Sequence, residues 1–79
     1  MDFNIIAQVV RFHRQKSGLS RNDLATLAGV GKTIIFDIEH GKQTVQWLSL
    51  MKILTALNIQ FVFKSPFMDA FYQTQSPEI

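Results

Sequence analysis

The chain has 79 residues, of which 47% are hydrophobic and 18% charged, a composition typical of one small folded domain and not of a disordered chain. It contains no cysteine, which excludes a disulfide framework and a thiolate metal site. No apolar run approaches the roughly 20 residues of a membrane span, and the N-terminus lacks a signal-peptide pattern. We therefore expect a cytoplasmic, nucleoid-associated protein with no membrane partner.

The formal net charge of +2 is unevenly distributed along the chain. All eight lysines and arginines lie at or before Lys64, where four acids leave an excess of four positive charges, and residues 65–79 carry two acids and no base. A basic body favours a polyanionic partner, although a solvated basic face is the alternative.

Residues 3–16 are predicted to form the first helix, because apolar side chains recur there at helical spacing. This stripe consists of Ile5, Ile6, Val9, Val10 and His13. His13 is interpreted as a packed residue. The two histidines lie far apart in the sequence, so we expect no catalytic site, no metal or other cofactor, and no enzyme.

The stretch from Ser20 to Gly41 is predicted to form two short helices joined by a tight turn. Ser20, followed three residues later by Asp23, is a signal related to the capping box. Gly29 ends the first helix, because glycine tolerates the left-handed conformation. The expected core residues are Leu24, Leu27, Val30, Ile35 and Ile38. Two helices joined by a glycine-containing turn are typical of a DNA-reading helix-turn-helix.

A fourth helix is predicted at residues 47–57 from its apolar spacing. Its stripe is Trp47, Leu50, Met51, Leu54 and Leu57. We interpret Trp47 as a core or interface anchor and not as a platform for stacking bases.

After Asn58 the apolar period changes from helical to alternating, and aromatic and β-branched residues predict a strand. A lone strand leaves backbone groups unpaired, and the same strand of a second copy would satisfy them. The expected dimerisation residues are Ile59, Gln60, Phe61, Val62 and Phe63. The predicted fold is all-α, with four main helices and one C-terminal β-strand that pairs across a homodimer. The alternative is an extended segment packed on the fourth helix.

Ser65-Pro66 is predicted to end the regular domain. The chain then divides into a helix-turn-helix and dimerisation domain, residues 1–64, and a partly flexible tail, residues 65–79. Residues 67–72 can form one helical turn capped by Ser65. The aromatic residues of this tail either dock on the dimer or stay available to a partner.

The outward residues of the second motif helix are the candidate base contacts, because the start of a recognition helix reaches base edges most readily. Arg21, at the positive end of the preceding helix, and Lys42 are candidate phosphate contacts. The full predicted DNA-binding set is Ser20, Arg21, Lys32, Thr33, Ile34, Phe36, Asp37 and Lys42. Ile34 and Phe36 contact thymine methyl groups or turn inward. Asp37 accepts from a cytosine amino group or orients Lys32 or Arg21.

The segment LSRNDLATLAGVGKTIIFDIEHGKQTV resembles the helix-turn-helix of the Xre (lambda-repressor-like) family, and within it the antitoxins and regulators related to HipB. The matching features are Leu24-Ala25, Ala28-Gly29-Val30, Ile35, Asp37-Ile38-Glu39, Gly41-Lys42 and Thr44-Val45. The resemblance covers about residues 5–63. It departs at Gly31, where a polar residue usually begins the recognition helix, and at Arg21, which replaces the usual glutamine.

The resemblance implies a lambda-repressor-like bundle and a homodimeric repressor that binds double-stranded DNA at a palindromic operator, commonly its own promoter. HipB-like members also neutralise a HipA-like serine/threonine kinase toxin, which makes this chain a candidate antitoxin of a toxin–antitoxin system. The alternative is a phage-type or stand-alone Xre-family regulator without a toxin partner. The resemblance further implies an ion pair between Arg14 and Glu39 that ties the first helix to the third.

Overall fold

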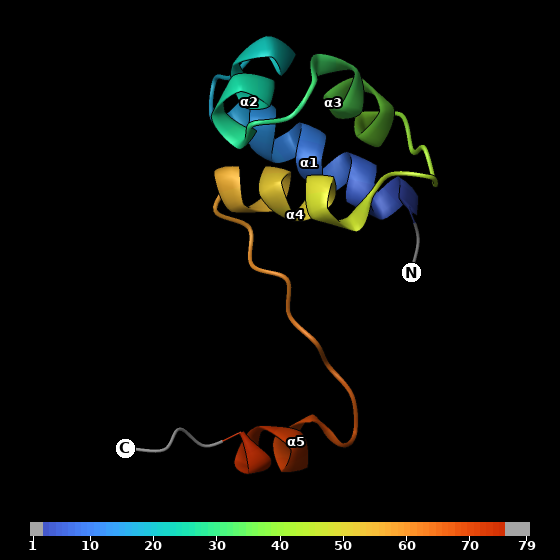
Figure 1. Ribbon diagram of the computed structural model, residues 1–79, viewed down its shortest axis with the longest axis vertical. Coiled ribbons are helices and arrows are strands. Elements are labelled where there is room, and N and C mark those ends of the chain that lie inside the picture. Colours follow the sequence, from blue (N-terminus) through green and yellow to red (C-terminus); the bar gives the residue numbers. More distant parts are fainter. Residues whose placement is uncertain (1–2, 76–79) are drawn as a thin grey trace.

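The computed structural model describes residues 3–75, and that part of the chain contains five helices. They are α1 (Phe3–Lys16), α2 (Arg21–Ala28), α3 (Lys32–Glu39), α4 (Trp47–Ala56) and α5 (Met68–Thr74). The first four pack into a bundle, in which α3 contacts α1, α2 and α4 and α2 also contacts α4 (Figure 1). The predicted all-α fold with a helix-turn-helix at α2 and α3 is confirmed.

The start and end of α2 follow from local chemistry. The Ser20 hydroxyl accepts a hydrogen bond from the Asp23 backbone N–H at 3.0 Å, and the Asp23 carboxylate accepts from the Ser20 N–H at 3.1 Å. This is the complete capping box that the sequence signal predicts. At the other end Gly29 has φ of +74°, and the Val30 N–H bonds to the Ala25 carbonyl at 3.0 Å.

The core of the bundle lies between the four helices. The buried apolar residues are Ala7, Val10, Leu24, Ala25, Ile35, Ile38, Leu50, Ile53, Leu54 and Leu57. Two residues predicted to face inward are instead exposed: Leu27 at 60% and Ile5 at 54%. On α2 the inward face runs through Leu24, Ala25 and Ala28, and a residue three positions after Leu24 lies beyond its edge. Trp47 is more than half exposed, so it is not a core residue of this chain.

Residues 59–63, which were predicted to form a strand, are an extended segment instead. No β-strand occurs within residues 3–75. Asn58, with φ of +59°, ends α4, and the Ile59 N–H bonds back to the Leu54 carbonyl at 2.8 Å. Beyond this point no backbone hydrogen bond joins residues 60–64 to another described residue. A β-strand requires hydrogen bonds to a neighbouring strand, and the described residues of this chain supply no such neighbour. Pairing across a dimer stays a prediction.

Helix α5 stands apart from the bundle at the end of this extended segment (Figure 1). It begins at Met68 and continues to Thr74, two residues beyond the predicted turn. The Ser65 hydroxyl accepts from the Phe67 N–H at 3.3 Å, just before the helix. The radius of gyration is 14.9 Å, against about 12 Å for a compact chain of this length. None of the described helices is long and apolar enough to span a membrane.

Candidate nucleic-acid interface

Two hollows border α3, and together they contain all eight residues of the predicted DNA-binding set. The reading cleft, between the first turns of α2 and α3, is lined by Arg14, Ser20, Arg21, Asn22, Lys32, Thr33 and Phe36. A second hollow is lined by Ile34, Asp37, Lys42, Thr44, Val45, Gln46 and Ser49. The polar lining residues that were not predicted as DNA contacts are Arg14, Asn22, Thr44, Gln46 and Ser49. Asn22 directly follows Arg21 in the first turn of α2, which is the signal that could have identified it.

Lys32 and Thr33 form the exposed first turn of α3, beside the reading cleft. Gly31 precedes them as the N-cap and provides no side-chain hydrogen bond to the helix. Within the part of the chain that the structure describes, the Lys32 ammonium takes part in no ion pair. Its charge is therefore not offset by a neighbouring acid.

Phe36 and Ile34 differ in orientation. Phe36 is 48% exposed and stacks on His40, with ring centroids 3.9 Å apart and an interplanar angle of 22°. The Arg21 guanidinium lies 5.7 Å from the centre of the Phe36 ring. Ile34 is half-buried and packs against the core cluster. Of the two alternatives, Phe36 thus presents its side chain to the cleft and Ile34 turns partly inward.

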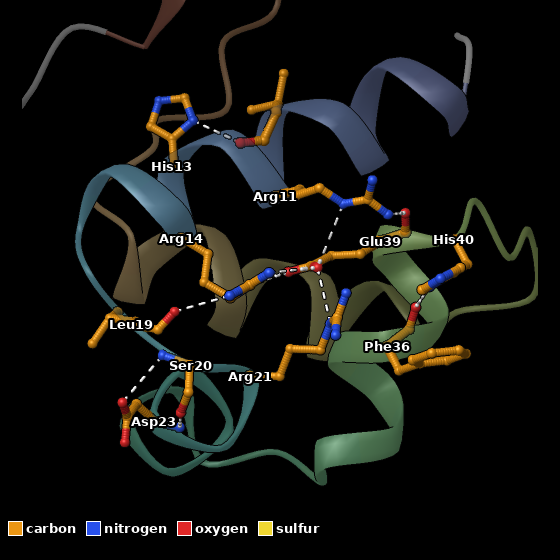
Figure 2. Close-up of polar contacts among 11 residues, drawn as sticks. Arg11, His13, Arg14, Leu19, Ser20, Arg21, Asp23, Phe36, Glu39 and His40 are labelled. Atoms are coloured by element: carbon orange, nitrogen blue, oxygen red, sulfur yellow. Dashed lines mark hydrogen bonds and ion pairs between the residues drawn. The ribbon is translucent and has the colours of Figure 1, made fainter.

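Glu39, at the end of α3, is buried and paired with Arg14 of α1 (Figure 2). Arg14 Nε lies 2.6 Å from Glu39 Oε2, and Arg14 Nη2 lies 3.1 Å from Oε1. Arg14 Nη1 also donates to the Leu19 carbonyl at 2.9 Å. This two-pronged contact confirms the ion pair expected between Arg14 and Glu39. It joins α1 to α3 and leaves the buried polar atoms of both side chains satisfied.

Arg21 and Arg11 approach the same carboxylate (Figure 2), and neither of these two contacts was predicted. Arg21 Nε donates to Glu39 Oε1 at 3.1 Å. Arg11 Nε lies 3.8 Å from that oxygen, and Arg11 Nη2 donates to the Glu39 backbone carbonyl at 3.0 Å. Three guanidinium groups thus surround one carboxylate. The cluster keeps an excess of two positive charges.

Of the three arginines, Arg21 places part of this excess positive charge at the reading cleft, where it lies between Glu39 and the cleft lining. Its side chain is 37% exposed, and Glu39 occupies its Nε. Arg21 also lines the cleft with Lys32 and Thr33. A guanidinium held by one edge still presents its terminal nitrogens in a fixed fork, which is suited to binding a phosphate.

Lys42 and Asp37 form an exposed pair on the other side of α3, with Lys42 Nζ 3.3 Å from Asp37 Oδ2. Asp37 therefore contacts Lys42, and not Lys32 or Arg21, which was one of its two predicted roles; the contact with a cytosine amino group stays a prediction. Exposed pairs contribute about 0–1 kcal/mol. Because a lysine ammonium has three donors, this contact leaves Lys42 able to bind a phosphate.

A helix-turn-helix family model, HTH_3, matches residues 10–63, which include α2, α3 and α4. The chain belongs to this family. An uncharacterized HTH-type transcriptional regulator of Sinorhizobium fredii, y4mF, is 34% identical over 61 residues, which are 77% of this chain and 80% of that protein. The chain is thus a helix-turn-helix DNA-binding transcriptional regulator of the Xre type, a family of regulators and not of enzymes.

Solved structures of two other proteins have the same fold. The restriction-modification controller protein C.AhdI from Aeromonas hydrophila is 31% identical, with a TM-score of 0.66 over 73% of this chain and 88% of that one. HipB, in its complex with the O4 20mer, is 20% identical, with a TM-score of 0.75 over 84% of this chain and 93% of that one. The likeness to HipB concerns the fold alone.

Proposed function

We propose that the chain is a homodimeric repressor that reads a palindromic operator through the reading cleft and the second hollow. The observation that carries this proposal is the Arg21 guanidinium, fixed by buried Glu39 at the mouth of the cleft that also contains Lys32 and Thr33. A fixed cation beside exposed side chains at the start of α3 is suited to holding phosphate while base edges are read.

The residues of the interface divide by role. Arg21 and Lys42 neutralise phosphates on the two sides of α3, with Ser20 beside Arg21 at the positive end of α2. Lys32 and Thr33 read base edges, because a lysine donates to guanine acceptors and a threonine methyl contacts a thymine methyl. Phe36 adds a second apolar contact. Asn22, Thr44 and Gln46 extend the polar surface around this centre.

The homodimer is supported by the unpaired backbone of the extended segment and by an aromatic cluster beside it. Phe61 meets Trp47 edge to face at a centroid distance of 5.0 Å, and Phe63 meets Phe61 at 5.5 Å. Trp47 and Phe63 are nevertheless both more than half exposed. Pairing of residues 59–63 with the same residues of a second copy would supply hydrogen bonds to one edge of this backbone and cover the cluster.

Two copies related by a two-fold axis would present two recognition helices to half-sites about one turn of DNA apart, roughly 34 Å. This arrangement explains why an operator for the protein should be palindromic. The relatives do not supply its sequence, because Gly31 and Arg21 differ from the usual family residues at the positions that begin the two motif helices.

The experiment is selection of DNA from a random library, followed by binding titrations on the selected and on unrelated sequences. We expect a palindrome whose affinity falls steeply with salt. Lys32→Ala and Thr33→Ala should reduce the preference for the selected site. Arg21→Ala and Lys42→Ala should weaken all sequences alike.

Lys16→Ala is the matched control, because it removes one exposed positive charge from α1 outside both hollows. It should change binding far less than the other lysine variants. Equal losses on selected and unrelated DNA for all four interface variants would contradict the division of roles. Selection that returns no sequence would contradict the function itself.

A second candidate function is that of an antitoxin that holds a HipA-like serine/threonine kinase inactive while repressing its own operon. The supporting observation is the set of exposed aromatic side chains on the segment outside the bundle, Phe67, Phe71 and Tyr72. A kinase-like reading frame beside the gene, and co-purification of that kinase with this chain, would support it. If the kinase encoded beside the gene forms no complex with this chain, the antitoxin function is contradicted and the alternative of a stand-alone regulator remains.

A further inference from the structure

An apolar groove lies along α2 and α4, separate from the two hollows around α3. It is lined by Leu27, Ala28, Leu48, Met51, Lys52, Thr55 and Ala56. Leu27 and Leu48 are 60% and 64% exposed, although both belong to helices of the bundle. Lys52 is the one charged residue of this lining. None of these residues lines the reading cleft or the second hollow, so an occupant here leaves the DNA interface free.

The C-terminal arm, residues 65–75, has the complementary character. Phe67, Met68, Phe71 and Tyr72 share one side of the helix by their spacing, and the three aromatic side chains are 79%, 50% and 52% exposed. Asp69 is the one charged residue of α5. A helix of seven residues is too short to be stable in water without packing. The arm therefore needs an apolar surface, preferably one with a positive charge.

The geometry of the proposed dimer brings the arm to the groove of the other chain. If residues 59–63 pair antiparallel about a two-fold axis at Phe61, Ile59 lies opposite Phe63 of the partner subunit. Because Asn58, with φ of +59°, separates Ile59 from α4, the residues that follow Phe63 then pass the C-terminal end of α4 of the partner subunit. Thr55 and Ala56 form that end of the groove. In an extended conformation, residues 59–64 place the start of the arm about 20 Å from the end of α4 of the same chain.

We propose that α5 of each protomer docks in the α2–α4 groove of its partner, so that two arms clasp the dimer reciprocally. Phe71 and Tyr72 cover the exposed Leu27 and Leu48, and Asp69 lies beside Lys52. The occupant of the groove is thus a second copy of this chain. The proposal rests on the homodimer proposed above, and adds to it the place where the arm binds.

The first test uses the absence of cysteine from the natural sequence. Lys52→Cys and Asp69→Cys are introduced together in the full chain and treated with a short bismaleimide cross-linker. We expect a covalent dimer in denaturing gels. Each single variant is one control, and Asp69→Cys combined with Lys16→Cys, on exposed α1, is the matched pair. A cross-link within one chain, or a yield no higher than that of the controls, would overturn the proposal.

The second test measures the dimer dissociation constant by sedimentation. Phe71→Ala should weaken dimerisation about tenfold or more, because each dimer loses two buried aromatic rings. The matched control is Phe12→Ala, which removes a similarly exposed ring from α1 and should have no effect. Lys52→Asp and Asp69→Lys should each weaken the dimer, and the double variant should recover part of the loss.

These measurements separate failure of the arm from failure of the dimer. A wild-type dimer that Phe71→Ala leaves unchanged, and in which the double-cysteine pair does not cross-link, would overturn the docked arm and leave strand pairing intact. A wild-type chain that sediments as a monomer at every accessible concentration would overturn both.

Discussion

The bundle, residues 3–57, buries many of its apolar side chains, whereas the segment that follows it, residues 58–75, leaves most of them exposed. Leu24, Ile35 and Ile53 are fully buried in the bundle, and its buried polar atoms all have partners within the described residues. No residue of the following segment is buried, and its aromatic rings are mostly exposed. The bundle can therefore fold from its own contacts, whereas the segment beyond it touches the core cluster only through Ile59 and Phe61 among the described residues.

The largest expected effect comes from breaking the Glu39 cluster inside the bundle. Arg14→Ala should lower the free energy of unfolding by about 3–5 kcal/mol, because it removes two of the three hydrogen bonds to a buried carboxylate and leaves only the one from Arg21. Lys42→Ala breaks an exposed pair and should cost less than about 1 kcal/mol. Chemical denaturation measures both. An Arg14→Ala variant with unchanged thermal stability would show that the pair does not hold α1 to α3.

The second largest difference is expected when an apolar side chain is truncated, because the loss of stability should be large in the bundle and small in the segment that follows it. Ile53→Ala should cost about 2–5 kcal/mol through the cavity it leaves in the core. Val62→Ala should leave the unfolding of the monomer nearly unchanged, because Val62 is 71% exposed. Denaturation at low protein concentration is the appropriate measurement. A comparable loss in both variants would mean that the extended segment belongs to the core.

A smaller effect is expected at the N-terminus of α2. Ser20→Ala removes the hydroxyl that accepts from the Asp23 N–H and should cost about 1 kcal/mol. In a domain of this size that corresponds to a decrease in Tm of roughly 4–8 °C. Ser17→Ala is the control, because Ser17 is exposed at the end of α1 and should not change Tm. Equal Tm values for Ser20→Ala and the wild type would contradict a stabilising capping box.

The smallest expected effect is the pH dependence of the same capping box. The Ser20 backbone N–H, and then its hydroxyl, hold the pKa of Asp23 below its ordinary value of 3.8. A lowered folded pKa stabilises the native state above the unfolded pKa, and this stabilisation is lost as pH falls through the folded pKa. Asp23→Asn should thus be less stable than the wild type at neutral pH and equal to it in strong acid. Stability differences that do not change with pH would exclude this contribution of the carboxylate.

The sequence predicted the bundle well because its signals are local. The capping box at Ser20 and Asp23 and the glycine after α2 act within a few residues of their own helix. Helical spacing also identified the apolar stripes, but spacing alone does not determine which residues at the edge of a stripe are buried against another helix. Leu27 was assigned to the core for this reason, and the packing of α2 left it exposed.

For the candidate site, helical spacing anticipated where the proposed residues lie but not their electrostatics, and their role in DNA binding stays a prediction. The eight residues of the DNA-binding set do gather around α3. The contact between Arg21 and Glu39 was missed, because it joins positions 18 residues apart and involves a residue that differs from the family pattern. Pairing of the predicted strand stays a prediction, because the backbone atoms that would complete it are those of the proposed second copy.

Hydrogen exchange of the backbone amides, measured at a low and a high protein concentration, tests the contrast between the two regions most directly. Amides within α1–α4 should be protected at both concentrations, because their partners lie in the same chain. Among residues 60–63, which have no backbone partner among the described residues, alternate amides should become protected only at the high concentration, because every second N–H of an antiparallel pair points toward the partner strand. Rapid exchange of residues 60–63 at every concentration would contradict the proposed strand pairing.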